Sequence, residues 1–188
     1  RIVNIMPPLG LCSLAAWVEH AGHTATIHDC YAFPGRHDRI DAYLRAESPR
    51  YVGFSTTTSS FPDAIRIARR IKEHYPKTRT VFGGVHISAL REQLLRDYPE
   101  IDYGVVGEGE ETLQAILGAR GEKLTNTRGL LYRDHDDVVF TGPRNTMLDL
   151  DRLPWPAYEK LEGFPTSYRL PIFNYPKAPG PRLYPAAA

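Results

Sequence analysis

The sequence is poor in cysteine and has almost no net charge, and both features restrict its function. Its two cysteines, Cys12 and Cys30, form no Cys-x-x-Cys pair, so we expect neither a disulfide scaffold nor a zinc or iron–sulfur site in these 188 residues. A reducing, cytoplasmic compartment is the simplest expectation. The 23 basic and 22 acidic residues are interspersed and leave a net charge of +1, which argues against a nucleic acid partner.

Long hydrophobic runs are also missing. No apolar stretch approaches the roughly 20 residues that a membrane helix needs, and no charged-then-apolar leader opens the chain. We therefore expect no membrane span. Residues 1–5 already have the composition of a strand, which suggests that the natural start lies upstream.

Apolar, strand-like runs alternate with amphipathic helical segments over the first 118 residues. The expected strands cover residues 1–5, 24–29, 51–55, 80–85 and 103–109. Such alternation is typical of a parallel sheet with helices on both faces, because each parallel connection must cross over the sheet. We predict an α/β fold, a Rossmann-like five-stranded parallel sheet in the flavodoxin-like order 2-1-3-4-5.

The pattern changes after about Gly118. Residues 128–144 indicate two strands around a polar turn, a β-hairpin that we expect outside the sheet. Residues 151–188 contain eight prolines, too many for a packed helix or a central strand. The expected organisation is a ligand-binding domain over 1–118, a hairpin extension over 119–150, and a proline-rich linker or wrapping arm over 151–188.

The loops at the carboxyl ends of the strands are rich in glycine and hydroxyl residues. In open α/β sheets these loops form the binding crevice, and here they can admit a bulky ligand close to the backbone. The candidate binding residues are Pro8, Leu9, Gly10, Ser55, Thr56, Thr57, Thr58, Gly83, Gly84, Val85, His86, Gly107, Glu108 and Gly109. For each loop taken alone, ordinary helix caps and turns are the alternative interpretation. No catalytic residue is identified.

Several ligands fit these loops poorly. A dinucleotide requires G-x-G-x-x-G after the first strand, where this chain has MPPLG at 6–10. The glycines of GEGEE at 107–111 are accompanied by three carboxylates, which would repel a phosphate. Flavin mononucleotide fits the hydroxyls, but its phosphate loop would be expected after the first strand, so it remains an alternative.

Six segments together resemble the amino-terminal cobalamin-binding domain of cobalamin-dependent radical S-adenosylmethionine enzymes. They are PPLGL (7–11), AGHTATIHD (21–29), the segment 52–76, VFGGVHIS (81–88), IDYGVVGEGEETL (101–113) and LDLDRLPWPAYE (148–159). That family includes methyltransferases and the anaerobic magnesium-protoporphyrin ester cyclase of chlorophyll synthesis. The resemblance implies that the chain binds cobalamin and positions it for methyl transfer or oxidative cyclisation.

The resemblance also implies how cobalamin would bind. Its nucleotide tail would lie beside the sheet, where Gly83 and Gly84 leave room, while Ser55 and Thr57 supply hydroxyls. The D-x-H-x-x-G element of related cobalamin domains is missing, and Pro7 takes the place of the cobalt-ligating histidine. We therefore expect base-off cobalamin with no histidine of this chain on cobalt. His86 is the alternative ligand, but we expect it to lie beside the cofactor and hydrogen-bond it.

The catalytic machinery of the family is not contained in this sequence. Its radical enzymes hold a [4Fe-4S] cluster through C-x-x-x-C-x-x-C, and this spacing is absent here. The cluster, S-adenosylmethionine and the radical S-adenosylmethionine barrel are thus implied for a further part of the same polypeptide or enzyme. A stand-alone corrinoid- or flavin-binding carrier or sensor is the alternative function.

Overall fold

The computed structural model of the protein describes residues 5–35, 37–119, 124–145 and 149–168. The described helices are α1 (Leu9–His20), α2 (His37–Glu47), α3 (Phe61–His74), α4 (Val85–Leu90), α5 (Glu92–Asp97) and α6 (Glu110–Gly118), with short 3-10 helices η1 (Leu124–Asn126), η2 (Leu150–Arg152) and η3 (Tyr158–Lys160). The strands are β1 (Tyr51–Ser55), β2 (Arg79–Gly83), β3 (Tyr103–Val105), β4 (Leu130–Asp134) and β5 (Asp137–Phe140). The expected first strand lies outside the described residues except for Ile5.

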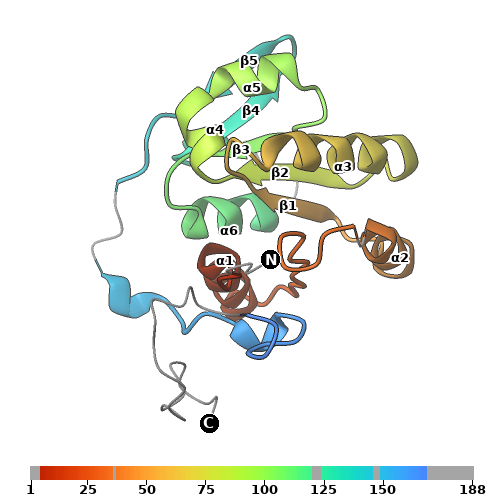
Figure 1. Ribbon diagram of the computed structural model, residues 1–188. Helices are drawn as coiled ribbons and strands as arrows, with labels where there is room; N and C mark the ends of the chain where they lie inside the picture. The colour runs from red at the N-terminus through yellow and green to blue at the C-terminus, as the bar shows by residue number, and fades with distance from the viewer. Residues whose placement is uncertain (1–4, 36, 120–123, 146–148, 169–188) are drawn as a thin grey trace.

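These strands form one five-stranded sheet in the order β1-β2-β3-β4-β5 (Figure 1). The strands β1, β2 and β3 are parallel, as predicted, and helices lie on both sides of them. The α/β fold class with a five-stranded sheet is therefore confirmed.

The hairpin lies inside the sheet, so its predicted position outside the sheet is wrong. Strand β4 pairs antiparallel with β3 and β5 pairs antiparallel with β4. The physical reason is the sequence of β4, in which Leu130 and Leu131 point to opposite faces and are both fully buried. An apolar strand of this kind needs cover on both faces, and pairing with β3 also satisfies an edge that would otherwise expose backbone groups.

The strand expected at 24–29 is also corrected. This segment has the alternating burial of an extended chain but belongs to no strand, so the predicted order 2-1-3-4-5 is not observed. Its polar groups have other partners: the Tyr43 hydroxyl donates to Thr26 Oγ1 at 3.0 Å, and Lys160 Nζ donates to the Ala25 carbonyl at 3.0 Å. The segment therefore lies against α2 and the segment around η3.

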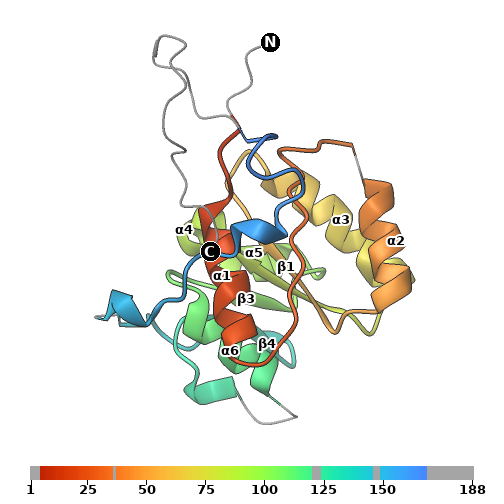
Figure 2. The same cartoon turned by 90° about the horizontal axis from the view of Figure 1, so that it is seen from below.

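Two apolar cores cover the two faces of the sheet. On one face α3, α4 and α5 bury Phe61, Ile87 and Leu95 against Phe82 of β2. On the other face α6 packs Ile116 against strands β2, β3 and β4. Figures 1 and 2 show α1 next to α6, on the side of the sheet away from α3.

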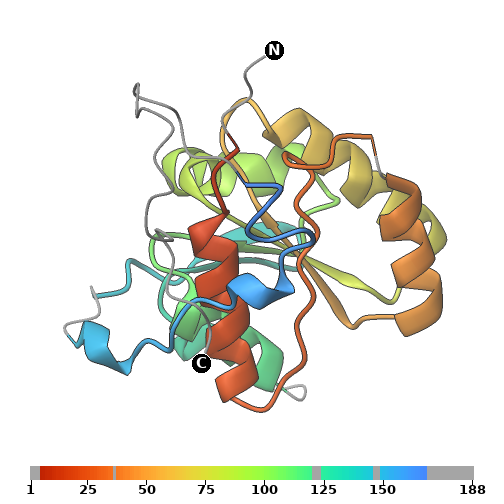
Figure 3. The ribbon, with the colours of Figure 1, turned by 60° about the horizontal axis from the view of Figure 1, so that its bottom comes forward.

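The segment from Leu153 to Tyr168 runs along α1 (Figure 3). The Ala157 N–H donates to the Cys12 carbonyl at 3.1 Å, and Lys160 forms an ion pair with Glu19 at 2.7 Å. Cys12 also packs with Leu161 and Tyr168 in a third apolar cluster. This part of the proline-rich region is thus anchored to the domain, and the rest of it lies outside the described residues.

An ion cluster at the amino ends of β2 and β3 holds these two strands together. Asp102 accepts hydrogen bonds from Lys72, from Arg79 at 2.9 Å and from the Thr80 N–H at 2.7 Å. Burial raises the pKa of Asp102, but these hydrogen bonds outweigh burial and leave the pKa below its ordinary value. Asp102 therefore stabilises the fold in its charged form.

Candidate functional site

The loops after β1 and β2 are tied together at the carboxyl end of the sheet. The Thr56 N–H and the Thr56 hydroxyl both donate to the Gly83 carbonyl, at 2.9 and 3.1 Å. The His86 N–H donates to the Thr56 carbonyl at 3.3 Å. Thr56 is only 3% exposed, so its role is to join the two loops.

Gly84 is required by the packing of the protein itself. Its φ of +93° lies in the left-handed region, and a Cβ there would lie 2.5 Å from the Thr56 oxygen and 2.8 Å from the Thr56 nitrogen. The alternative interpretation of Gly84, a tight turn between strand and helix, therefore explains this glycine without any ligand.

Gly83 has a different environment and belongs to an uncovered part of the sheet. Ser55 and Gly83 are partners in the β1–β2 ladder, and Gly53 lies two residues before Ser55, so all three face the side that carries α6. Gly53 and Ser55 are exposed; among the described residues, a Cβ at Gly53 would meet no atom within 4 Å, and one at Gly83 no atom nearer than 3.9 Å. We call Gly53, Ser55 and Gly83 the open strip.

Gly53 was missed by sequence reasoning. It stands in the middle of β1 between bulky residues, where glycine weakens a strand and often marks a site at which a ligand approaches closely. That signal was present in YVGFS. Only the tertiary structure shows that Gly53 faces the side of α6 and that no side chain of the described residues covers it.

Residues 57–60, which we call the hydroxyl loop, follow Thr56, the residue that comes directly after β1. Thr57 Oγ1 lies 3.1 Å from both Ser59 Oγ and Ser60 Oγ, and the Thr57 N–H donates to Ser60 Oγ at 3.0 Å. All four side chains are exposed. The loop therefore presents neutral hydroxyl groups in a fixed shape.

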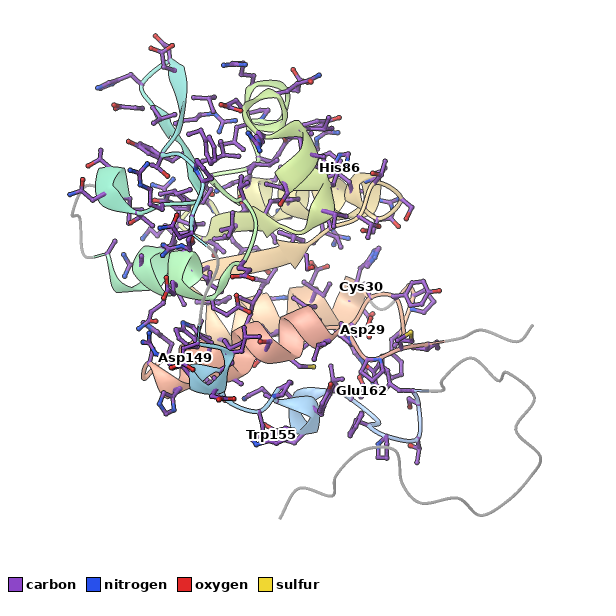
Figure 4. The ribbon with its side chains drawn as sticks, turned by 90° about the vertical axis from the view of Figure 1, so that its left-hand side faces the viewer. Asp29, Cys30, His86, Asp149, Trp155 and Glu162 are labelled. Atoms are coloured by element: carbon purple, nitrogen blue, oxygen red, sulfur yellow. The ribbon has the colours of Figure 1, made fainter. Side chains whose placement is uncertain are left out.

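His86 lies under the hydroxyl loop and faces away from the open strip. Its Nδ1 is 3.2 Å from Thr58 Oγ1, and its ring lies 4.4 Å from the ring of Phe61, which belongs to the core on the α3 face. The residue is 9% exposed. Figure 4 shows His86 in α4, with Asp29 and Cys30 below it at the same end of the molecule.

The first and last candidate loops join this end of the sheet. The Gly107 N–H donates to Ser88 Oγ at 3.1 Å, and a Cβ at Gly109 would lie 3.3 Å from Leu14 of α1. Pro8 precedes α1 and is half-buried, whereas Gly10, Gly107 and Glu108 are exposed. Leu9 is 56% exposed and Val85 is 67% exposed, so the rim also carries apolar side chains.

The thiols near this end are poor nucleophiles and metal ligands. Burial, Glu159 and Asp29 raise the pKa of Cys12 to about 11, and burial, Asp29 and Asp63 raise the pKa of Cys30.

Within the described residues, no group of three or more His, Cys, Asp or Glu side chains could hold a metal ion. In the same part of the chain no helix is both long and apolar enough to span a membrane.

Comparison with known proteins relates the chain to cobalamin-binding domains. The profile of the B12 binding domain family matches residues 1–117. An uncharacterized methyltransferase of Pyrococcus horikoshii is 33% identical over 157 residues, which cover 82% of this chain and 34% of the relative. An anaerobic magnesium-protoporphyrin IX monomethyl ester cyclase of Synechocystis sp. is 31% identical over 156 residues, 80% of this chain and 31% of the relative. The chain spans about a third of these curated relatives.

A solved structure shares the fold. The radical S-adenosylmethionine methyltransferase TsrM from Kitasatospora setae, determined with cobalamin and a [4Fe-4S] cluster bound, superimposes with a TM-score of 0.63. The match has 20% sequence identity and covers 84% of this chain and 31% of TsrM.

Proposed function

Because the chain belongs to the B12-binding domain family, we propose that it is the cobalamin-binding part of a cobalamin-dependent radical S-adenosylmethionine enzyme. The observation that carries this proposal is the open strip. The sheet face that α6 covers elsewhere is exposed at Gly53 and Ser55. Two of the three residues of the open strip, Gly53 and Gly83, are glycines and have no side chain. A flat, bulky group can approach the backbone there.

The residues present fit the nucleotide tail of cobalamin. Gly53 and Gly83 would leave the space for it, while Ser55 and Thr57 would offer neutral hydrogen bonds to its polar groups. The exposed apolar side chains of Leu9 and Val85 would contact the corrin ring at the rim. Bound cobalamin supplies cobalt-centred chemistry for methyl transfer or oxidative cyclisation, and the residues of this chain orient it.

We further propose that no histidine of this chain ligates cobalt. Pro7 stands where related domains carry the ligating histidine, and a proline side chain has no lone pair to offer. His86 has its Nδ1 against Thr58 and its ring against Phe61, on the other face of the sheet from the open strip. Electron paramagnetic resonance of the cob(II)alamin form should therefore lack the triplet splitting that a coordinated nitrogen produces. Triplets that vanish in His86→Ala would contradict this assignment.

The cluster, S-adenosylmethionine and the barrel that binds them belong, in this proposal, to a further domain. A natural reading frame that continues into C-x-x-x-C-x-x-C would agree with it. A frame without that motif would favour the alternative, a stand-alone corrinoid carrier or sensor.

The primary test is binding. The protein is incubated with hydroxocobalamin or with flavin mononucleotide, passed over a gel-filtration column, and examined by visible absorption, since the two ligands have different bands. We expect about one retained corrinoid per chain, with a base-off spectrum. Retention of flavin without corrinoid would overturn the proposal in favour of a flavin-binding module, to which the hydroxyl loop also offers suitable partners.

A further inference from the structure

The geometry points to His86 as a positioning residue, which holds the hydroxyl loop in place for the ligand without contacting the ligand itself. This inference rests on the proposed function and assigns His86 a role different from that of cofactor contact. It concerns the link between residues 57–60 and helix α4, through the hydrogen bond of Thr58 with His86.

His86 is held both at its ring and at its backbone. Its ring packs on Phe61, which is 5% exposed and lies 6.0 Å from the ring of Phe82 in the sheet. The backbone N–H of His86 donates to the carbonyl of Thr56, the residue directly before the hydroxyl loop. A ring fixed in this way provides a rigid hydrogen-bonding point, because it cannot move without disturbing the core.

The two ends of the hydroxyl loop are anchored by Thr56 and by the first turn of α3, where the Phe61 N–H donates to the Thr57 carbonyl at 3.0 Å, and His86 adds an anchor between them. The hydrogen bonds among Thr57, Ser59 and Ser60 fix the shape of the loop but connect residues that are only two or three positions apart. The contact of Thr58 with His86 joins residues 28 positions apart and so fixes the loop relative to α4. Since the open strip belongs to the rigid sheet, this contact, together with the anchored ends of the loop, sets where the loop hydroxyls stand relative to the strip.

Two variants of His86 separate positioning from packing. His86→Phe keeps a ring on Phe61 but cannot bond Thr58, so we expect a melting temperature close to that of the wild type and an affinity for hydroxocobalamin lowered roughly fivefold. His86→Asn loses the ring but retains a polar atom near the position of Nδ1. It should melt at a lower temperature and, when folded, bind hydroxocobalamin nearly as tightly as the wild type.

Thr58→Val provides a second route, because it keeps the shape of an exposed side chain and removes only the hydroxyl. We expect the same fivefold loss, and the double variant with His86→Phe should also lose about fivefold, because both changes break one hydrogen bond. Losses that multiply to about 25-fold would overturn the proposal. Thr125→Val, at an exposed threonine of η1, is the matched control and should leave the affinity unchanged.

A measurement without ligand distinguishes failure of this inference from failure of the proposed function. Amide hydrogen exchange of residues 57–60 should be several-fold faster in Thr58→Val and in His86→Phe than in the wild type and in Thr125→Val. If the wild type bound no corrinoid, the proposed function would fail while this exchange test could still succeed. Unchanged exchange in both variants would refute the positioning role of His86.

Discussion

Gly53 offers the sharpest test of the open strip, because its substitution should leave the fold intact. A Cβ at position 53 meets no atom of the described residues within 4 Å, and the backbone of β1 is already extended, so Gly53→Val can be accommodated there. Valine is favoured over glycine in strands on a scale that spans about 1 kcal/mol, so the variant should be as stable as the wild type or slightly more so. For a chain of this size, the melting temperature should change by no more than about 4 °C.

The same variant should bind cobalamin poorly. The three added carbon atoms stand on the strip where the nucleotide tail would lie. If they displace about 100 Å² of apolar contact, then at about 25 cal/mol per Å² the loss is about 2.5 kcal/mol, or about 70-fold in the dissociation constant. Gly53→Ala adds one carbon and should give a smaller loss, so the affinities should fall in the order Gly, Ala, Val.

The assay is titration of hydroxocobalamin followed by visible absorption, beside thermal unfolding of the same samples. Gly84→Ala is the contrasting variant: its Cβ would lie 2.5 Å from the Thr56 oxygen and its φ is strained, so we expect a loss of at least about 2 kcal/mol and a melting temperature lower by about 4 °C or more. Binding by Gly53→Val within about threefold of the wild type would show that the ligand does not pass over β1.

Three further predictions concern the rest of the domain. Asp102→Asn should lower the free energy of unfolding by about 2 kcal/mol at pH 7. The pKa of Asp102 in the folded state lies below 3.8, so its contribution to stability is present above pH 3.8 and is lost as the pH falls through the folded pKa. Urea unfolding at pH 3 should therefore show a smaller difference between variant and wild type. In a thiol-labelling assay of the native protein, Cys30 should react before Cys12, which is fully buried, and equal rates would contradict the packing of α1. Tryptophan fluorescence should contain an iodide-quenchable component from Trp155, 84% exposed, that disappears in Trp155→Phe, while buried Trp17 remains protected.

Local patterns were sufficient for much of this molecule. Helix α3 follows from its stripe of Ala64, Ala68 and Ile71, all buried, and the strands β1, β2 and β3 follow from short apolar runs. The expected loops after β1 and β2 do meet, because parallel strands end at the same edge of a sheet. The helix and the strands depend on residues that are close together in the sequence, and the meeting of the loops follows from the parallel pairing of β1 and β2.

The remaining features depend on competition between distant segments for the same edges and faces. The hairpin could be recognised from its own residues, but its place beside β3 depends on which strand offers a free edge and an apolar face to Leu130 and Leu131. Residues 24–29 have a strand-like pattern, yet polar groups of this segment are hydrogen-bonded to Tyr43 of α2 and to Lys160. Periodicity describes which side of a segment is apolar, and it cannot say which partner will cover that side.

The site illustrates the same division. Its glycines and hydroxyls could be read from the sequence. The sequence could not tell that a Cβ at Gly84 would clash with the backbone of Thr56, whereas a Cβ at Gly53 or Gly83 would clash with none of the described residues. Nor could it show that His86 is turned toward Phe61 and away from the strip. The sequence gives the chemical type of each residue, whereas the direction of its side chain and the free space around it are set by the packing of elements that are far apart in the sequence.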